Sequence, residues 1–536
     1  MITVKKLPFG IQNFRKIIES DYVYADKTRY IYELINDASN YFLSRPRRFG
    51  KSLLLDTIAE AFSGDRELFK GLFIYESDYC FDKHPVLRLD MSNIANETSK
   101  ILKDSLTSEL KTRAKKEGFE LESNLPSDVL KTLIEELYNK YGRGVIILID
   151  EYDKPILDHI DELELAEANR KVLRGFYGVL KSMDPFLRLT FITGVTKFTK
   201  TTVFSGLNNL RDITLSEEYS NICGIAIEDL DRYFYEHIKK LAASGKYGNY
   251  NNIRDKILEW YDGYSWDGMT HVINPYSLLS FFSEKKFSGF WYASGTPKFL
   301  TDLIKNRQDG YTRLENLEMG EWSLDTFEID NIEVEALLFQ TGYLTVKEIL
   351  PEQEPPVYLL GIPNYEVRIA FNLNILAEFT GRGGVYTETA YRKLKESLKT
   401  GNLQSMLMVL RGLFASIPYQ LHIGQEAYYH SIFYAIMNLI GFDIEAEVST
   451  SGGRIDGMLE LDDKVYIIEF KYENCAPDST PETKKNLFSK ALAEGMKQIE
   501  DRGYYMKYIA SGKTIYQAAF AFLGRDNIEI ATSVRS

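Results

Sequence analysis

Short apolar runs alternate with helix-like stretches through the first third of the chain. This alternation is typical of a parallel sheet covered by helices on both faces. It predicts strands at 41–44, 85–91, 144–149 and 187–192, a helix over 52–62 and a charged, helical pattern over 97–140. The fold expected for this region is therefore an α/β domain.

The pattern changes after this region. From about 225 to 300 it becomes mainly helical and aromatic, with turns at YDGYSW and NPY that lead into helices. Over 333–371 a helix is followed by two expected strands, LTVKEI and IPNYEV, around a proline-rich turn. A helix with a two-stranded wing is compatible with a winged-helix-like unit. A connecting pair of helices is expected over 385–417.

A second α/β unit is expected towards the C-terminus. Its predicted elements are a helix at 426–440, strands at 444–448, 454–461 and 464–471, a helix at 482–501 and a strand at 515–522. A chain of 536 residues is too long for one hydrophobic core. We therefore expect four segments: an α/β domain at 1–224, a helical and winged-helix-like region at 225–375, a helical connector at 376–420 and a second α/β domain at 421–536.

Composition and charge narrow the class of protein. A content of 44% hydrophobic and 26% charged residues is that of a globular chain. The net charge of −13 argues against a surface coated with positive charge for unspecific binding to nucleic acid or membranes. The three cysteines are widely spaced, and neither a signal peptide nor an apolar run of membrane-spanning length is found. We expect a cytoplasmic protein without membrane contact.

A phosphate-binding turn is the strongest candidate for chemistry in the first third. RPRRFGKS at 45–52 lies between an expected strand and an expected helix, and its Gly-Lys-Ser ending is the core of a Walker A loop. In such a loop the glycine lets the backbone face phosphate, the lysine reaches the β- and γ-phosphates, and the serine ligates Mg²⁺. Arg45 stands where the full pattern has glycine. The expected nucleotide contacts are Arg48, Phe49, Gly50, Lys51 and Ser52.

An acidic pair follows the apolar strand at 144–149. Asp150 is expected to hold Mg²⁺ together with Ser52, and Glu151 to polarise the attacking water, as in a Walker B element. The alternative is a core strand followed by a solvated acidic turn. The order, spacing and strand context of the two motifs favour a nucleotide site.

These segments resemble the AAA-ATPase-like family found mainly in bacteria and archaea. LPFGIQNF, YADKTRYIYEL, SRPRRFGKSLLLD and ILIDEYDKPI carry the resemblance, and YDGYSW, NPYSLL and QTGYL extend it over roughly residues 5–370. In this family RPRRFGKS replaces the glycine-led loop, so Arg45 is a family feature. The resemblance implies a module that binds and hydrolyses ATP.

The remaining polar residues of this module allow more than one interpretation. Thr193 resembles a sensor residue that contacts the γ-phosphate, and a threonine that satisfies the end of its strand is an equally good explanation. Arg174, Arg188 and Arg211 are candidates for an arginine finger. Each of them is better explained as a surface charge, so none is assigned.

Two adjacent strands expected near the C-terminus carry the pattern D-x12-E-x-K, formed by Asp456, Glu469 and Lys471. Side chains alternate along a strand, so Glu469 and Lys471 share one face, where Asp456 can meet them. Two carboxylates can hold Mg²⁺ while the lysine steers a water towards a phosphodiester. The alternative is an exposed ion pair across the strands. The apolar run VYIIEF favours a buried strand, in which charges need a purpose.

This region resembles the PD-(D/E)XK nuclease superfamily over about 415–523. The resemblance rests on EAYYHSIFYAI, GRIDGMLEL, YIIEFKY and ALAEGMKQIEDRGYY. It implies a metal site formed by Glu426, Asp456 and Glu469, with Lys471 as a catalytic partner and Gln498 as a helix-borne auxiliary. Taken alone, Glu426 is better explained as a solvated helix N-terminus.

The expected function is an ATP-regulated, metal-dependent nuclease. ATP and Mg²⁺ are the expected cofactors, with Mn²⁺ as an alternative at the nuclease site, and nucleic acid is the expected partner, DNA more than RNA. Assembly into a homo-oligomer is a further expectation. Residues 421–536 contain 12 basic and 17 acidic side chains, and this excess of negative charge disfavours a DNA-binding surface. Two alternatives remain: a nucleotide-driven switch or scaffold whose nuclease fold binds without cutting, and an ATPase whose C-terminal fold mediates assembly.

Overall fold

The computed structural model describes residues 4–535 except for 38–39, 199–202, 205–206, 208, 292–316, 326–332, 351–354, 417–431, 434–435, 438, 441–442, 448–453, 474, 476–478 and 524–526. Of residues 325, 379, 443–447, 454–456, 504, 507 and 510 it describes the backbone alone. The chain forms two compact units, Met1–Ser294 with Asn316–Glu366, and Gly295–Glu315 with Val367–Ser536. The fold is α/β and multidomain, and the finer division into four segments stays a prediction.

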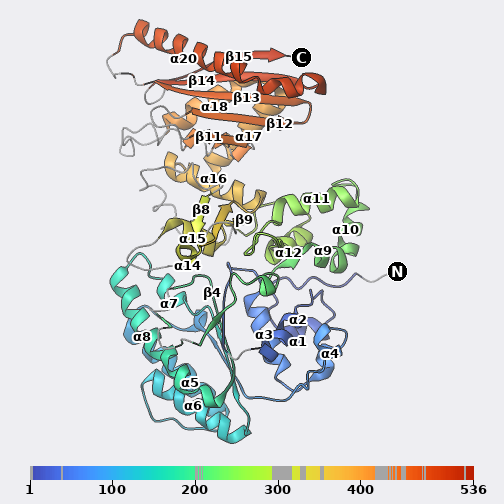
Figure 1. Cartoon of the computed structure of the whole chain (residues 1–536), viewed down its shortest axis with the longest axis vertical. Coiled ribbons are helices and arrows are strands. Elements are labelled where there is room, and N and C mark those ends of the chain that lie inside the picture. The colour runs from blue at the N-terminus through green and yellow to red at the C-terminus, as the bar shows by residue number, and fades with distance from the viewer. Residues whose placement is uncertain are drawn as a thin grey trace. The chain divides into compact units, whose positions relative to one another are not determined.

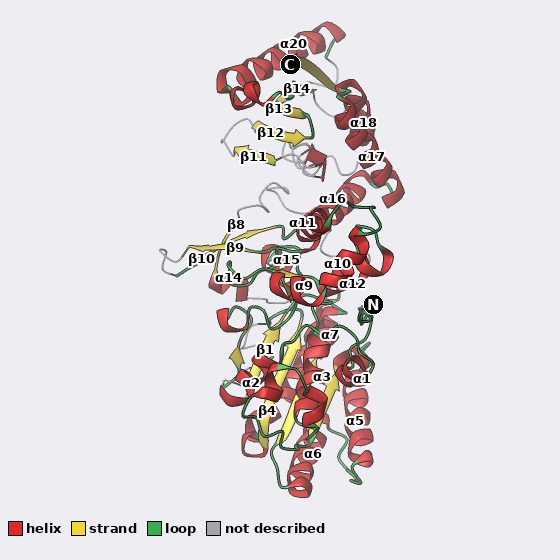
Figure 2. Ribbon diagram, turned by 90° about the vertical axis from the view of Figure 1, so that its right-hand side faces the viewer, coloured by secondary structure: helices red, strands yellow, loops and turns green. Residues whose placement is uncertain are grey.

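A five-stranded parallel sheet forms the centre of the first unit, in the order β2-β3-β4-β1-β5. Its strands are β1 (Asn40–Ser44), β2 (Val86–Asp90), β3 (Val145–Asp150), β4 (Leu187–Gly194) and β5 (Arg211–Asp212). Figure 2 shows β1 and β4 side by side, as their pairing requires. Every residue of β3 is buried, which explains the apolar run at 145–149.

Helices cover this sheet on both sides. They are α1 (Phe14–Glu19), α2 (Thr28–Asp37), α3 (Lys51–Ala61), α4 (Phe73–Glu76), α5 (Ser99–Lys116), α6 (Pro126–Tyr141), α7 (Lys154–Leu157) and α8 (Leu163–Ser182). Helices α1–α4 lie on one side of the strands and α5–α8 on the other (Figure 1). The helical pattern at 97–140 forms two helices, because Gly118 turns left-handed after the first and Pro126 begins the second. The predicted parallel α/β fold is confirmed.

A helical layer follows the sheet in sequence. It contains α9 (Ile227–Tyr233), α10 (Tyr235–Ala242), α11 (Tyr250–Tyr261) and α12 (Pro275–Glu284), with a short ladder of β6 (Ile225–Ala226) and β7 (Val272–Ile273). Its core includes Phe234, Ile257 and Phe281. The Asn274 side chain accepts hydrogen bonds from the first backbone N–H groups of α12. The predicted turn into a helix at this asparagine is therefore confirmed.

The expected wing has three described strands instead of two. The elements are β8 (Leu317–Gly320), α14 (Glu321–Asp325), α15 (Val334–Thr341), β9 (Thr345–Leu350) and β10 (Val357–Gly361), with the sheet order β8-β10-β9. The prediction of a strand at IPNYEV is wrong, since VYLLG forms β10 and the chain enters α16 (Tyr365–Thr380) at Tyr365. Pro363 has no N–H for a strand ladder, which accounts for the end of pairing there.

The second unit is built around a mixed five-stranded sheet in the order β11-β12-β13-β14-β15. Its elements are α17 (Gly384–Thr400), α18 (Leu403–Ala415), β11 (Asp443–Glu447), β12 (Arg454–Leu461), β13 (Lys464–Glu473), α20 (Pro481–Arg502), β14 (Thr514–Leu523) and β15 (Asn527–Arg535). The predicted helix pair and strands are confirmed, whereas β15 was not predicted. Most of the helix expected at 426–440 lies outside the described residues.

The side chains of β13 divide between two faces of this sheet. Val465 and Ile467 pack with Ile499 of α20 on one face. Phe470 points to the other face and packs against Phe522 of β14 at 4.6 Å between ring centroids. Side chains alternate along the strand, so the charged residues predicted on β13 lie on the face that α20 covers. No helix in the described part of the chain is both long and apolar enough to cross a membrane.

Gly194, the last residue of β4, allows a close approach that any side chain would block. An added Cβ would lie 2.5 Å from the ring of Tyr152 and 2.7 Å from Asp153 Oδ1. We predict that Gly194→Ala lowers the free energy of unfolding by about 2 kcal/mol, because the fully buried Tyr152 ring would have to shift. Urea titration followed by tryptophan fluorescence measures this, since all four tryptophans lie in the first unit.

Gly178→Ala in α8 is the matched control, because a Cβ there meets no atom within 4 Å. It should raise the free energy of unfolding by about 0.5–1 kcal/mol through helix propensity. Equal unfolding midpoints for Gly194→Ala and the unchanged protein would contradict the steric account.

Candidate nucleotide and nuclease sites

The phosphate loop connects β1 to α3. Gly50 precedes the first residue of α3 with φ of 96°, and Arg48 has φ of 70°. These left-handed turns fold the loop around the Lys51 ammonium. Its Nζ donates to the carbonyl oxygens of Arg45 at 2.8 Å and of Pro46 at 3.0 Å. The predicted strand, loop and helix of a phosphate-binding turn are thus present in this order.

Opposing electrostatic effects act on Lys51, which is only 6% exposed. Burial lowers the pKa of its ammonium, and the negative charges of Asp150, Glu151 and Asp153 oppose this shift. The acidic end of β3 therefore lies within electrostatic reach of the loop lysine. The two motifs, about a hundred residues apart in the sequence, form one site.

Asp150 and Glu151 lie at the carboxyl end of β3. Thr193 Oγ1, at the end of the neighbouring β4, donates to Asp150 Oδ1 at 2.8 Å, and both side chains are buried. Glu151 follows with a left-handed φ of 49°, and burial raises the pKa of its carboxyl group. The structure thus places Thr193 against the carboxylate that is expected to bind metal, which fixes the orientation of that carboxylate.

Asp153 has a structural role that the sequence did not indicate. Its Oδ2 accepts hydrogen bonds from Thr196 N at 2.6 Å, from Thr196 Oγ1 at 2.7 Å and from Val195 N at 3.0 Å. Burial raises the pKa of this carboxyl group, and the bonds from Thr196 oppose the shift. Asp153 therefore ties the turn after β3 to the turn after β4, next to Asp150 and Thr193.

Four aromatic residues from the helical layer and its flanks contact the phosphate loop, and we call them the aromatic collar: Tyr264, Trp266, Tyr276 and Trp291. The Arg45 guanidinium lies 3.9 Å from the centroid of the Trp266 ring, and that of Arg48 lies 3.8 Å from the centroid of the Tyr276 ring.

The remaining collar contacts involve Phe49 and Arg47. Phe49 packs edge-on against Tyr264 with centroids 4.7 Å apart, and the Trp291 indole donates to Arg47 O at 3.1 Å. Every residue from 45 to 49 except Pro46 is therefore touched by the collar. Pro46 faces Gly342, where an added Cβ would lie 2.8 Å from the proline ring.

Arg45 is fully buried on the outer side of the loop. It donates to Ser44 O at 2.9 Å and to Thr214 O at 2.8 Å. Burial lowers the pKa of this guanidinium to about 10, so it stays charged at neutral pH. The arginine that replaces the first Walker A glycine thus connects the loop to the chain beyond β5.

The donor set at this site fits Mg²⁺. Asp150 offers a carboxylate that is 2% exposed, and Ser52 offers a hydroxyl in the first turn of α3. Hard oxygen ligands of this kind suit Mg²⁺, which in phosphate sites keeps several waters and needs only one or two protein ligands. Within the described residues no three His, Cys, Asp or Glu side chains gather as a metal cage.

Three of the nuclease candidates, Glu469, Lys471 and Gln498, meet on the face of β13 that α20 covers. Asp456 of β12 is directly opposite Glu469 of β13 in the strand register. Lys471 Nζ donates to Glu469 Oε1 at 2.9 Å and to Gln498 Oε1 at 2.6 Å, and Glu469 is 2% exposed. The Asp456 side chain and all of Glu426 lie outside the described residues.

A glycine that the sequence did not single out allows α20 to lie close to this group. A Cβ at Gly495 would be 2.8 Å from Ala519 Cβ, 3.5 Å from Lys471 Cγ and 3.6 Å from Glu469 Cγ. Gln498, one helical turn later, has a buried Nε2 for which the described residues supply no hydrogen-bond partner. A glycine inside an expected helix was the available signal, because it is unfavourable there without a packing reason.

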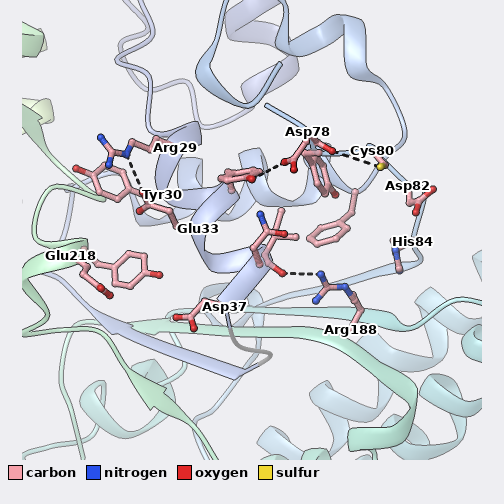
Figure 3. Close-up of a pocket in the computed structure, with 16 residues that line it drawn as sticks. Arg29, Tyr30, Glu33, Asp37, Asp78, Cys80, Asp82, His84, Arg188 and Glu218 are labelled. Carbon is pink, nitrogen blue, oxygen red and sulfur yellow. Dashed lines mark hydrogen bonds and ion pairs between the residues drawn. The ribbon is translucent and has the colours of Figure 1, made fainter. Parts of the chain in front are cut away.

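A cavity of about 990 Å³ lies in the first unit (Figure 3), away from the candidate nucleotide site. His84 precedes β2 and Arg188 lies near the start of β4, so this cavity is at the amino ends of the parallel strands, whereas Lys51 and Asp150 lie at the carboxyl ends. Ligands of open α/β sheets bind at the carboxyl ends. We assign no function to this cavity.

The arginine-finger candidates are accounted for by the same geometry. Arg188 donates to Ile35 O, and Arg211 pairs with Asp37 and Glu218 at the amino edge of the sheet. Arg174 is an exposed residue of α8. No arginine of this group is brought to Lys51.

Comparison with known proteins identifies the two domains in which these residues lie. Residues 8–204 match the family model described as predicted AAA-ATPase, and residues 424–531 match that of the PD-(D/E)XK nuclease superfamily. The "uncharacterized protein in vnfD 5'region" of Azotobacter chroococcum mcd 1 is 35% identical over 525 residues, covering 97% of this chain and 96% of that protein. The chain belongs to the AAA-ATPase-like family with a C-terminal PD-(D/E)XK domain. Both resemblances seen in the sequence are confirmed.

In this AAA-ATPase-like protein, Thr193 offers a direct test of how Asp150 is positioned. We predict that Thr193→Val raises the Mg²⁺ concentration needed for ATP turnover by about tenfold or more, because the buried carboxylate loses its hydroxyl donor. Thr193→Ser keeps the hydroxyl and should behave like the unchanged protein. Phosphate release measured across a Mg²⁺ titration compares the three proteins, and identical titration curves would exclude this role.

Proposed function

We propose that the first unit binds ATP with Mg²⁺ and hydrolyses it. The observation that carries the proposal is the meeting of the Lys51 ammonium with the charges of Asp150 and Glu151 at one edge of the sheet. A buried cation and a pair of carboxylates at the carboxyl ends of parallel strands are what a nucleoside triphosphate and its metal require. Membership of the AAA-ATPase-like family supports the same activity.

Each polar residue of this site has a proposed role. Lys51 binds the β- and γ-phosphates, and Ser52 and Asp150 hold Mg²⁺. When bound, Mg²⁺ neutralises phosphate charge in the way described for other nucleotide hydrolases. Glu151 accepts a hydrogen bond from the attacking water, and burial raises the pKa of its carboxyl group, which suits a group that takes up a proton. Thr193 keeps the Asp150 carboxylate oriented.

A small apolar cavity supports a nucleotide as the ligand. It has a volume of about 100 Å³ and touches Gly50 and Leu53 at the start of α3, together with Ile222, Phe234 and Leu279. Apolar walls favour a planar base, and the contact with Gly50 puts the base next to the phosphate loop. Inorganic polyphosphate would leave this cavity without an occupant.

We further propose that the C-terminal domain cleaves phosphodiester bonds in nucleic acid, DNA more than RNA. Glu426, Asp456 and Glu469 hold Mg²⁺ or Mn²⁺, and Lys471 orients the water. The bound ion supplies charge stabilisation at the scissile phosphate. The buried Glu469–Lys471 pair supports this assignment, because burying such charges without a function is unfavourable. We assign both activities to the cytoplasm, because three widely spaced cysteines suit a reducing compartment.

One observation favours a second candidate, a nucleotide-driven switch whose nuclease fold binds a partner without cutting. The acidic balance of residues 421–536 disfavours strong contact with nucleic-acid phosphates. Cleavage assays separate the two candidates.

Lys51→Ala tests the nucleotide site. It should weaken ATP binding by at least about a hundredfold, because the charge-assisted bonds to the phosphates are lost. Glu151→Gln should keep ATP bound while turnover falls by about 10²–10⁴-fold. Calorimetry and phosphate release measure the two effects. Lys131→Ala, an exposed lysine of α6, is the matched control. ATP affinity equal to that of the unchanged protein in Lys51→Ala would disprove the site.

Asp456→Ala and Lys471→Ala test the nuclease site on supercoiled, linear and single-stranded DNA and on RNA. Both should abolish cleavage while ATP turnover is largely retained, since ATP turnover is assigned to the first unit. Chelation of Mg²⁺ and Mn²⁺ should abolish it as well. Lys490→Ala, an exposed lysine of α20, should cut normally. If Asp456→Ala cuts at the normal rate the assignment is wrong, and if no substrate is cut the switch is favoured.

A further inference from the structure

Two hydrogen bonds fix the direction of peptide planes in the phosphate loop. The Trp291 indole N–H donates to Arg47 O at 3.1 Å, and the backbone N–H of Gly224 donates to Phe49 O at 3.2 Å. In a trans peptide the C=O and the following N–H point in opposite directions. The N–H groups of Arg48 and Gly50 are therefore turned away from Trp291 and Gly224.

Two other carbonyls of the loop point towards its inside. Arg45 O and Pro46 O both accept from the Lys51 ammonium, which lies inside the loop. Arg48 and Gly50 have left-handed backbones, with φ of 70° and 96°. A turn that combines right- and left-handed residues gathers its N–H groups into a concave anion site. The two outer bonds thus select which loop groups face a phosphate.

Trp291 is itself held in place from several directions. Its backbone N–H donates to Glu366 Oε1 at 2.7 Å, and its ring packs against Tyr343 with centroids 5.2 Å apart. Gly342 has φ of 91°, and a Cβ there would lie 3.3 Å from the Trp291 ring. Glu366 is fully buried, and burial raises the pKa of its carboxyl group to about 7. The indole therefore has little freedom to release Arg47.

We propose that Trp291, held by Glu366, is a positioning residue of the nucleotide site. Its indole N–H keeps the Arg47–Arg48 peptide turned so that the Arg48 N–H faces the phosphates. This inference rests on the proposed ATP site and adds to it a residue about 240 positions away in the sequence. It assigns Trp291 to phosphate recognition and gives it no contact with the base.

Trp291→Phe tests the assignment, because phenylalanine keeps an aromatic ring and removes the N–H. ATP and ADP should bind at least about tenfold more weakly, as expected when one loop hydrogen bond is lost. The affinity for adenosine, measured by competition, should stay within twofold, a selectivity that a general packing defect would not produce. Trp260→Phe, in α11, is the matched control and should bind ATP as tightly as the unchanged protein.

The outcomes separate this inference from the proposed function. If Lys51→Ala loses ATP while Trp291→Phe binds ATP as tightly as the unchanged protein, the ATP site stands and the role of Trp291 is wrong. If adenosine affinity falls in parallel with ATP affinity, the effect is one of packing and the role is also wrong. If the unchanged protein binds no ATP, the proposed function fails and this inference fails with it.

A measurement on the unchanged protein covers the case in which Trp291→Phe does not fold. The chain has four tryptophans, so ¹⁵N-tryptophan labelling gives four indole signals, which single Phe variants of Trp260, Trp266 and Trp322 assign by elimination. Addition of ADP with Mg²⁺ should shift the Trp291 indole signal, because its acceptor belongs to the phosphate loop. The Trp260 signal should stay in place. An unchanged Trp291 signal at saturating ADP overturns the proposal.

Discussion

The N-terminal unit depends on a buried ammonium group that the chain must keep surrounded by negative charge. A charge away from water is costly unless it is hydrogen-bonded and balanced. Lys51 meets this condition with two loop carbonyls and with the charges at the end of β3. The sheet order places β3 and β1 on either side of β4, so the strand ends that carry these groups meet at one edge.

Contacts from other segments of the chain hold the loop around Lys51 in shape, in addition to the bonds within the loop. YDGYSW contributes Tyr264 and Trp266, NPYSLL contributes Tyr276, and QTGYL contributes Gly342, and each of these residues contacts the loop. The segments that extend the family resemblance beyond the sheet are thus the ones that contact residues 45–49. Arg45 takes part in these contacts from the outer side, which explains how an arginine can replace the usual glycine. The phosphate loop therefore depends on packing by the helical layer and by Gly342 as well as on the sheet.

Local patterns predicted the parts of each site that lie on one strand or one turn. The apolar run before Asp150 and the alternation that puts Glu469 and Lys471 on one face were both readable, because they depend on neighbours in sequence. Contacts between segments that are distant in the sequence could not be predicted from it. Nothing near Trp291 indicates that its indole meets Arg47, and nothing near Gly194 indicates the ring of Tyr152. β15 and β8 were missed because each owes its place to pairing with β14 or β10.

We propose that a nucleotide binds where the phosphate loop, the acidic end of β3 and the aromatic collar meet. Hydrogen–deuterium exchange with and without ATP and Mg²⁺ tests it most directly. The account predicts slower amide exchange in peptides covering 45–54 and 145–153, and also in peptides covering 261–276, because the collar contacts the loop. Exchange that is unchanged at 45–54 under conditions in which ATP is bound would contradict it.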